Sequence, residues 1–216
     1  MGDRDPGQTT LNEVAKRASV CPACKLSQTR KFVVFGEGDP HAKLMFIGEG
    51  PGEREDATGR PFVGRAGALL DRALRENGLH RPDVYIANIV KCRPVLMEDG
   101  RARNRPPEQE EIDACRPWLE SQVQLIQPKV ILCLGSPSAN TIIHKNFKIT
   151  LERGQFFTSQ WAKSVIATLH PAYVLRLMGD PHQTGYKALV EDIAKAWSKA
   201  NEEIPVPPGE DQLSLF

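Results

Sequence analysis

Four cysteines of this sequence are spaced as metal ligands are. Cys21 and Cys24 form a Cys-Pro-Ala-Cys pair, while Cys92 and Cys115 stand singly on either side of a loop rich in arginine and proline. Four thiolates suit tetrahedral zinc or an iron–sulfur cluster, and the spacing alone does not choose between them. The other interpretation, a redox pair with two unrelated thiols, is weakened because the pair precedes the first expected strand. The sequence therefore predicts a structural site that ties the amino-terminal arm to the loop.

Residues that could act on a small ligand follow three apolar runs. Gly48-Glu-Gly-Pro-Gly-Glu53 follows the first run, Asn88 lies near the end of the second, and His170 follows the last, next to Pro171. Glycines let backbone amides approach a ligand closely. Neither a Gly-x-Gly-x-x-Gly nor a P-loop pattern is present, so a nucleotide cofactor is poorly supported. Taken singly, Asn88 could be a turn residue and His170 a structural histidine.

The elements that must position these residues are visible as apolar patterns. Short apolar runs predict buried strands at Leu44–Ile47, Val84–Val90, Val130–Leu134 and Ser164–Leu169. Helical spacing predicts helices at Leu11–Arg17, Gly67–Asn77, Glu108–Ile126, Ser138–His144 and Tyr186–Ala200. Strands that alternate with helices predict an α/β protein, a three-layer α/β/α domain with a central, mostly parallel four-stranded sheet. Cys133, inside the third run, is expected in the core.

Such a sheet also predicts where a ligand binds. In open parallel sheets, ligands bind outside the carboxyl ends of the strands. We therefore expect the segments that follow the four strands to converge on one crevice. These segments are Gly48–Phe62, Lys91–Pro94, Gly135–Ala139 and His170–Arg176.

Bulk composition sets limits on partners and location. The 216 residues are 40% hydrophobic and 25% charged, as in ordinary globular domains. The net charge is only +1, so a nucleic-acid surface must be local, with the candidates Arg60, Arg65, Lys91, Arg93, Arg101, Arg103 and Arg105. No apolar run could span a bilayer, and the polar start lacks a signal-peptide core. These features predict a cytoplasmic protein whose cysteines bind metal rather than form disulfides.

Five segments together closely resemble family-4 uracil-DNA glycosylases, in the same order from about Cys21 to Trp197. They are Gly-Glu-Gly-Pro-Gly-Glu53, Gly-Arg-Pro-Phe-Val-Gly-Arg-Ala-Gly67, Asn88-Ile-Val-Lys-Cys-Arg-Pro94, Cys115-Arg-Pro-Trp-Leu119 and His170-Pro-Ala-Tyr-Val-Leu-Arg176. The resemblance implies an enzyme that flips uracil out of DNA and hydrolyses its N-glycosidic bond, which initiates base excision repair. It also implies that the four cysteines hold a 4Fe–4S cluster rather than zinc.

The resemblance also implies roles for three residues around the flipped base. Phe62 would stack on uracil. The side-chain amide of Asn88 would pair with N3–H and O4 of uracil, because an amide offers an acceptor and a donor on adjacent atoms. His170 would donate a hydrogen bond to the negative charge that develops on O2 when the glycosidic bond breaks.

Further positions follow from the same resemblance. Glu49 and Gly50 would hold the attacking water, with Glu49 as a base, and Glu55 would form the pocket wall near C5 of uracil. Either glutamate could instead be a solvated loop carboxylate. The segment Tyr173–Leu177 would enter the minor groove, where an apolar wedge fills the vacated space. The implied DNA-contacting residues are Arg65, Leu175, Arg176 and Leu177, of which either leucine could instead be core.

One departure from the family lies between Cys92 and Cys115, where Val95–Arg103 looks inserted. A related branch of the family carries a longer loop here, with a histidine that captures the sugar covalently. This loop has no histidine, which favours turnover over the alternative of a uracil-DNA capture protein. A third hypothesis, an iron–sulfur electron-transfer protein or nucleotide-dependent oxidoreductase, lacks a dinucleotide fingerprint.

The chain divides into a predicted glycosylase domain at residues 1–202 and a Pro-rich tail at residues 203–216. The segment Ile204–Gly209 cannot continue a helix. The last five residues resemble the peptide with which bacterial proteins bind the sliding clamp: Gln212, Leu213, Ser214, Leu215 and Phe216. The alternative is that this peptide docks on the protein's own surface. We expect the protein to be a monomer.

Overall fold

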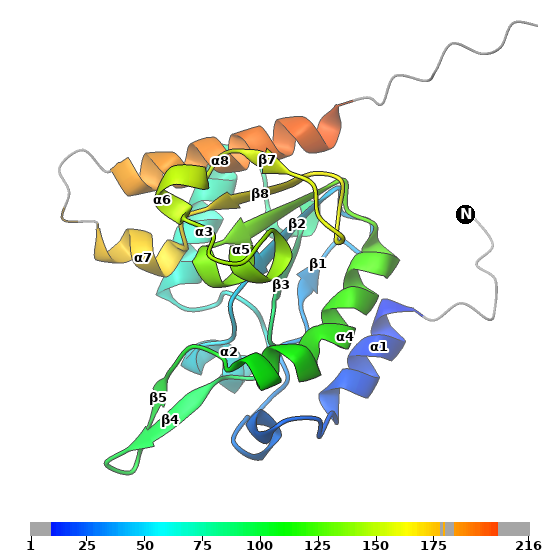
Figure 1. Ribbon diagram of the computed structural model, residues 1–216, viewed down its shortest axis with the longest axis vertical. Coiled ribbons are helices and arrows are strands. Elements are labelled where there is room, and N and C mark those ends of the chain that lie inside the picture. The colour runs from blue at the N-terminus through cyan, green and yellow to red at the C-terminus, as the bar shows by residue number, and fades with distance from the viewer. Residues whose placement is uncertain (1–9, 178, 180–183, 203–216) are drawn as a thin grey trace, which may run out of the picture.

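A six-stranded sheet forms the centre of the protein (Figure 1). The computed structural model describes residues 10–177, 179 and 184–202. The strand order is β1-β3-β2-β6-β8-β7, in which the four inner strands are parallel and the two edge strands antiparallel. Their bounds are β1 Glu37–Gly38, β2 Leu44–Gly48, β3 Tyr85–Asn88, β6 Val130–Leu134, β7 Phe156–Phe157 and β8 Val165–Thr168.

The four predicted strands are confirmed as the parallel centre of this sheet. The prediction of four strands omitted β1 and β7, which add to its edges. Each edge strand has only two residues, too few to show an alternating or apolar pattern. The sheet is therefore wider than the sequence pattern indicated.

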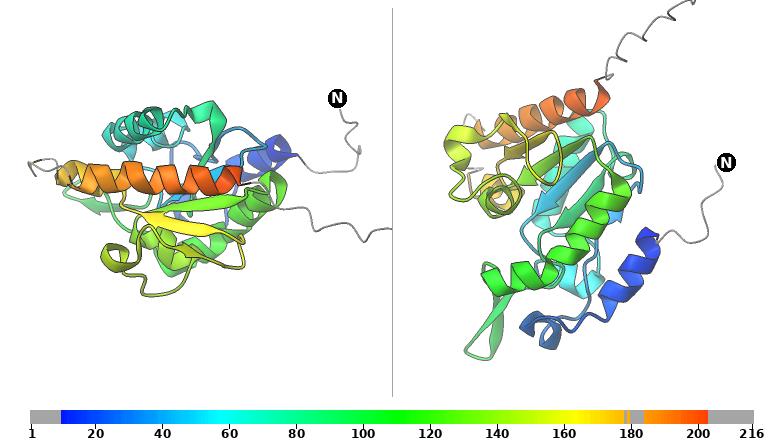
Figure 2. Two further views of the ribbon diagram at one scale, coloured as in Figure 1. Left: turned by 90° about the horizontal axis from the view of Figure 1, so that it is seen from above. Right: turned by 45° about the vertical axis from the view of Figure 1, so that its right-hand side comes forward.

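Helices cover both faces of the sheet, which confirms the three-layer arrangement (Figure 2). Along β2, Leu44 and Phe46 pack against one helical layer, and Met45 and Ile47 against the other, because successive side chains of a strand point to opposite faces. The first layer consists of α3 (Arg65–Glu76), α7 (Pro171–Arg176) and α8 (Thr184–Asn201). The second consists of α4 (Gln109–Ile126) and α5 (Ser136–Ile142). Cys133 is fully buried.

The remaining elements lie around these layers. Helix α1 (Leu11–Ser19) packs on α4 and begins with a capping box between Thr10 and Glu13. The others are η1 Lys25–Gln28, α2 Glu53–Thr58, η2 Arg81–Asp83 and α6 Ile149–Glu152. Helix α5 begins two residues before its predicted start, since Pro137 occupies the first turn, where its fixed φ suits a helix.

The segment that looked inserted forms a β-hairpin that projects from the body (Figure 1). Strands β4 (Val95–Glu98) and β5 (Arg101–Asn104) pair antiparallel. Asp99 and Gly100 connect them with φ values of 50° and 72°, as a two-residue hairpin turn with an Asp-Gly sequence requires.

No helix in the described ranges is long and apolar enough to cross a membrane. The predicted tail, with the clamp-binding peptide Gln212–Phe216, lies outside the residues that the structure describes.

Candidate active site

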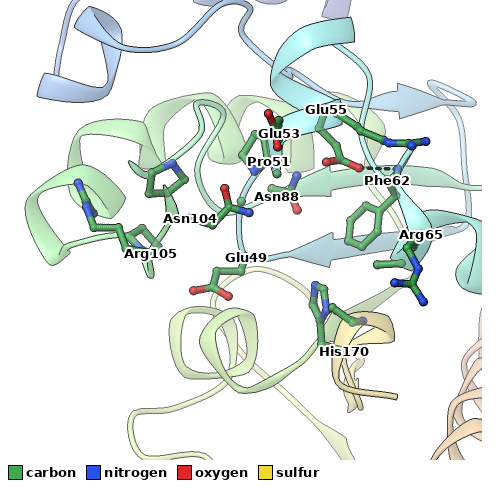
Figure 3. Close-up of a pocket in the computed structure, with 18 residues that line it drawn as sticks. Glu49, Pro51, Glu53, Glu55, Phe62, Arg65, Asn88, Asn104, Arg105 and His170 are labelled. Carbon is green, nitrogen blue, oxygen red and sulfur yellow. Dashed lines mark hydrogen bonds between the residues drawn. The ribbon is translucent and has the colours of Figure 1, made fainter. Parts of the chain in front are cut away.

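A cavity of about 400 Å³ opens at the carboxyl ends of the parallel strands (Figure 3). The segments after β2, β3 and β8 line it, as the topology predicts. The segment Gly135–Ala139, expected to join them, does not line this cavity. Instead, Gly135 packs behind His170, where a Cβ atom would lie 2.9 Å from the His170 Cβ.

The amide of Asn88 lies at the floor of the cavity with an unused acceptor. Asn88 is 1% exposed, and its Oδ1 has no hydrogen-bond partner. In the sheet, Asn88 lies directly opposite Gly48 of β2. A Cβ atom on Gly48 would lie 2.4 Å from the Asn88 Oδ1 and 2.6 Å from the Phe62 Cζ. Gly48 is therefore required for space, since any side chain there would occupy the floor.

Phe62 borders the same space in a strained backbone conformation. Its φ is +52°, which is unfavourable for a bulky residue and is found mainly at functional sites. The guanidinium of Arg81 donates to the carbonyl oxygens of Pro61 and Phe62 and also to Asp71. Gly67 leaves room for this turn, because a Cβ there would collide with the Phe62 carbonyl. Arg81 was not among the predicted site residues.

His170 faces Phe62 with their ring centroids 5.8 Å apart (Figure 3). Its Nδ1 accepts a hydrogen bond from the Ala172 backbone N–H at 3.0 Å, so His170 caps helix α7. The pKa of His170 is lowered to about 4, chiefly by burial and also by the charge of Arg176, while Glu55 opposes the shift. The imidazole is therefore neutral near pH 7, and with Nδ1 as acceptor its proton lies on Nε2.

Two glutamates line the cavity in different ways. Burial raises the pKa of the Glu49 carboxyl, and this side chain lies apart from the Glu55 loop (Figure 3). The Oε1 of Glu55 accepts the backbone N–H groups of Val63 and Gly64, each at 2.8 Å. Glu55 thus fixes the loop that carries Phe62. Gly50 also lines the cavity, and a Cβ there would lie 2.8 Å from the Val90 Cγ2.

The predicted rim residues occupy distinct environments. Arg65 lines the cavity, and Arg176 lies over the ring of Tyr173, 5.6 Å from its centroid. Leu175 packs against the core, whereas Leu177 is 36% exposed at the end of α7. Of the two leucines, Leu177 therefore has the exposure that a wedge needs.

The prediction that Lys91 and Arg105 belong to an exposed nucleic-acid surface is wrong. Lys91 is 1% exposed and belongs to the interior. Its Nζ donates to the Asn88 carbonyl oxygen at 2.8 Å and to the Gln122 Oε1 at 2.5 Å. Arg105 makes two hydrogen bonds to the buried Glu111, and Arg60 makes two to Glu37. Arg105, whose side chain is 17% exposed, therefore holds the structure together, whereas the 61% exposed side chain of Arg60 stays at the surface.

The four cysteines Cys21, Cys24, Cys92 and Cys115 line one small cavity between the amino-terminal arm, the end of β3 and helix α4. N–H groups point at three of the sulfurs: those of Trp118 toward Cys21, Arg30 toward Cys92 and the Lys91 backbone toward Cys115, at 3.4, 3.6 and 3.2 Å. Within the described part of the chain, no group of three or more His, Cys, Asp or Glu side chains is arranged to hold a metal ion. Four thiols with N–H donors around them suit a group that keeps its sulfurs as thiolates.

Known proteins resemble this chain over most of its length. The model of the uracil DNA glycosylase superfamily matches residues 35–195. A type-4 uracil-DNA glycosylase of Thermotoga maritima is 44% identical over 191 residues, which cover 88% of this chain and 94% of the relative. The type-4 enzyme of Sulfurisphaera tokodaii is 44% identical over 174 residues, or 77% of this chain and 76% of the relative. That of Saccharolobus solfataricus is 44% identical over 173 residues, 76% and 77% of the two chains.

The matched span begins just before β1 and ends inside α8, so it contains every segment that lines the cavity. The family model and the site at the carboxyl edge of the parallel sheet together define this protein as a DNA glycosylase. The identity of 44% over at least 76% of each chain narrows the class further. The chain belongs to the type-4 uracil-DNA glycosylases of the uracil DNA glycosylase superfamily.

Proposed function

We propose that this protein excises uracil from DNA by hydrolysing the N-glycosidic bond. The observation that carries the proposal is the unpaired Oδ1 of Asn88, buried at the floor of a cavity of about 400 Å³. A buried acceptor without a partner is costly. A base that offers N–H beside a carbonyl would satisfy both atoms of the amide, and uracil presents N3–H beside O4. Cytosine presents the opposite pattern on that edge.

Selectivity follows from this pairing and from the shape of the cavity. A base with the wrong edge leaves buried polar atoms unpaired, so the site disfavours it by roughly 10⁴-fold relative to uracil. Phe62 supplies a flat surface for the ring, and its position is fixed by Arg81 and Gly67. Glu55 lines the cavity, and we assign the rejection of the thymine methyl group to this wall.

Bond cleavage leaves negative charge on the base and positive charge on the sugar. The neutral Nε2–H of His170 donates to the charge on uracil O2, and its orientation is set in advance by the bond from Ala172 to Nδ1. On the other side of the sugar, Glu49 and Gly50 hold the water. The ionised Glu49 accepts the proton of this water and stabilises the cationic sugar.

We also propose that the four cysteines hold a 4Fe–4S cluster with a structural role. Their shared cavity, the N–H donors that face their sulfurs and the type-4 relatives support this assignment. The cluster would tie the arm to β3 and α4. Chemical analysis of iron and acid-labile sulfide tests this assignment, with about four atoms of each expected per chain. Both should be lost in Cys92→Ser and retained in Cys133→Ala.

DNA outside the cavity is held, in this proposal, by Arg65 on one side and by Arg176 with Leu177 at the end of α7. Binding of the sliding clamp by Gln212–Phe216 and a monomeric state remain predictions. Deletion of the last five residues should abolish co-elution with the clamp and leave uracil excision intact, and unchanged co-elution would remove the claim.

The decisive experiment follows free uracil from a single strand that contains one uracil. Release over many turnovers is expected, with none from strands that contain cytosine or thymine at that position. Release of less than one uracil per protein, with a stable protein–DNA product, would instead indicate capture. The loop between Cys92 and Cys115 has no histidine to form such a product.

A further inference from the structure

The β4–β5 hairpin borders the cavity but takes no part in the chemistry above. Pro94, Asn104 and Arg105 at its base line the cavity, while its tip projects away from the body (Figure 1). In Figure 3, Asn104 and Arg105 lie on the opposite side of the cavity from Arg65. A strand of DNA that delivers an internal base into the cavity extends from it in two directions, and the hairpin borders the cavity on the side opposite Arg65.

The two faces of the hairpin differ in character. Cross-strand pairing places Val95, Met97, Ala102 and Asn104 on one face, because paired residues share a face and alternate residues return to it. By the same pairing, the other face carries Leu96, Glu98, Arg101 and Arg103. Since Asn104 borders the cavity, the face with Asn104 continues the cavity wall outward. Met97 on that face is 60% exposed. On the opposite face, Leu96 is 50% exposed beside Arg101 and Arg103.

The hairpin segment also carries excess positive charge. Residues 93–105 contain four arginines against one glutamate and one aspartate. Arg105 is committed to Glu111 and Arg93 to Asn104, and Arg103 reaches Glu98 across an exposed ion pair of 3.1 Å. Arg101 has no ion pair with any residue of the described ranges. Exposed pairs contribute little, so Arg101 and Arg103 are available to a polyanion.

We propose that the β4–β5 hairpin binds the DNA strand beside the flipped nucleotide through the face that carries Arg101 and Arg103, with Leu96 against the bases and the two arginines against the phosphates. This rests on the proposed function for its register, since the flipped base fixes where the strand leaves the cavity. Strands of four residues extend roughly 13 Å, a length that matches about four stacked nucleotides of one strand. Continuity with the cavity and the positive charge both favour nucleic acid over a protein partner.

The test compares Arg101→Ala/Arg103→Ala with a control that loses two charges elsewhere. Lys129 and Lys163 are exposed; Lys129 directly precedes β6 and Lys163 lies two residues before β8, so both lie at the amino edge of the sheet, away from the cavity. Binding to a 30-nucleotide single strand without uracil is measured by fluorescence anisotropy over a range of salt concentrations. Leu96→Ala is measured in parallel, because it changes the apolar contact on the same face and leaves the charges.

We expect the arginine variant to bind the long strand about tenfold more weakly, with a salt slope smaller by about 1.4, since each single-strand phosphate contact contributes roughly 0.7. Lys129→Ala/Lys163→Ala should match the unaltered protein. Excision from a trinucleotide with central uracil should be unchanged, because so short a substrate does not reach the tip. Leu96→Ala should weaken binding several-fold without altering the slope.

Equal affinity and slope in the arginine variant and its control would overturn the proposal. So would a molar mass of two chains by light scattering that the variants reduce to one without changing DNA affinity, since the hairpin would then join two copies. The binding assay uses a strand without uracil. Failure of the unaltered protein to release uracil would therefore count against the proposed function and leave this test valid.

Discussion

The ammonium group of Lys91 donates a hydrogen bond to the backbone oxygen of Asn88 over 2.8 Å, inside the protein. The same Nζ reaches Gln122 on α4, and the Lys91 backbone N–H faces the Cys115 sulfur. One residue thus joins the floor of the active site to the cysteine cavity. Lys91 therefore fixes the end of β3, the strand that positions the Asn88 amide.

Lys91→Met should therefore weaken excision more than an ordinary core substitution does. Removing the donor leaves two buried acceptors unpaired, at about 1–3 kcal/mol each. We expect kcat/KM on single-stranded uracil DNA to fall at least tenfold at a temperature where the variant is fully folded. As a matched comparison, Cys133→Ala alters a buried core position outside the site. Equal activity losses in the two variants would argue against a positioning role.

Asn88→Ala should abolish recognition of the base and leave the fold intact. The change removes both atoms that pair with uracil, and the loss in kcat/KM is expected to lie between 10² and 10⁴, on the order of the discrimination set by buried polar pairing. Single-turnover rates measure the loss, and thermal unfolding checks the fold. A near-normal rate would mean that another group reads the base.

Gly48→Ala should block the cavity with a single methyl group. Its Cβ would lie 2.4 Å from the Asn88 Oδ1, so either the amide or Phe62 must move. We predict at least a 100-fold loss of excision with undiminished affinity for uracil-free DNA. Gly179→Ala is the control, because no atom lies within 4 Å of a Cβ at that position.

Arg81→Met should act through Phe62. Without the guanidinium, the Pro61 and Phe62 carbonyls lose these donors, and the positive φ of Phe62 can relax. We expect about a tenfold loss in kcat/KM, equivalent to about 1.4 kcal/mol. In a Phe62→Ala background the same substitution should have little further effect, as a double-mutant cycle shows for coupled residues. Full additivity would separate the two residues.

The pKa of His170 predicts a stability change in acid. The folded value of about 4 lies below the ordinary histidine value of 6.5. Between these values the unfolded chain binds more protons, so stability rises with pH and is lost as the pH falls from 6.5 toward 4. His170→Gln should remove this contribution, on the order of 2 kcal/mol between pH 7.5 and 4.5. Urea unfolding of both proteins at the two pH values measures it, and identical pH dependence would contradict it.

Much of the architecture could be predicted because buried parallel strands are apolar throughout and end in polar segments. That pattern located β2, β3, β6 and β8 and placed Asn88 and His170 at the same edge. An apolar pattern does not reveal which polar side chains pair when they lie far apart in the sequence. Lys91 was predicted at the surface because a lysine is rarely buried without partners, and its partners, including Gln122, lie far along the chain. Arg81 was not predicted as a site residue for the same reason.

The hairpin was missed although its signal was present. Asp99-Gly100 between two short segments is typical of a two-residue turn, but the surrounding arginines lack the alternating apolar pattern of a half-buried strand. This hairpin is exposed on both faces, so no burial pattern forms. Local turn chemistry, rather than periodicity, was the informative feature.

The short antiparallel strands at the margins of the sheet bear on how the protein behaves at high concentration. A long parallel edge would offer its free N–H and C=O groups to another chain, which is a common start of aggregation. Here β1 and β7 cover the two outer parallel strands and are only two residues long. Each edge strand therefore offers another chain too few backbone N–H and C=O groups for stable pairing, which disfavours edge-to-edge fibre formation.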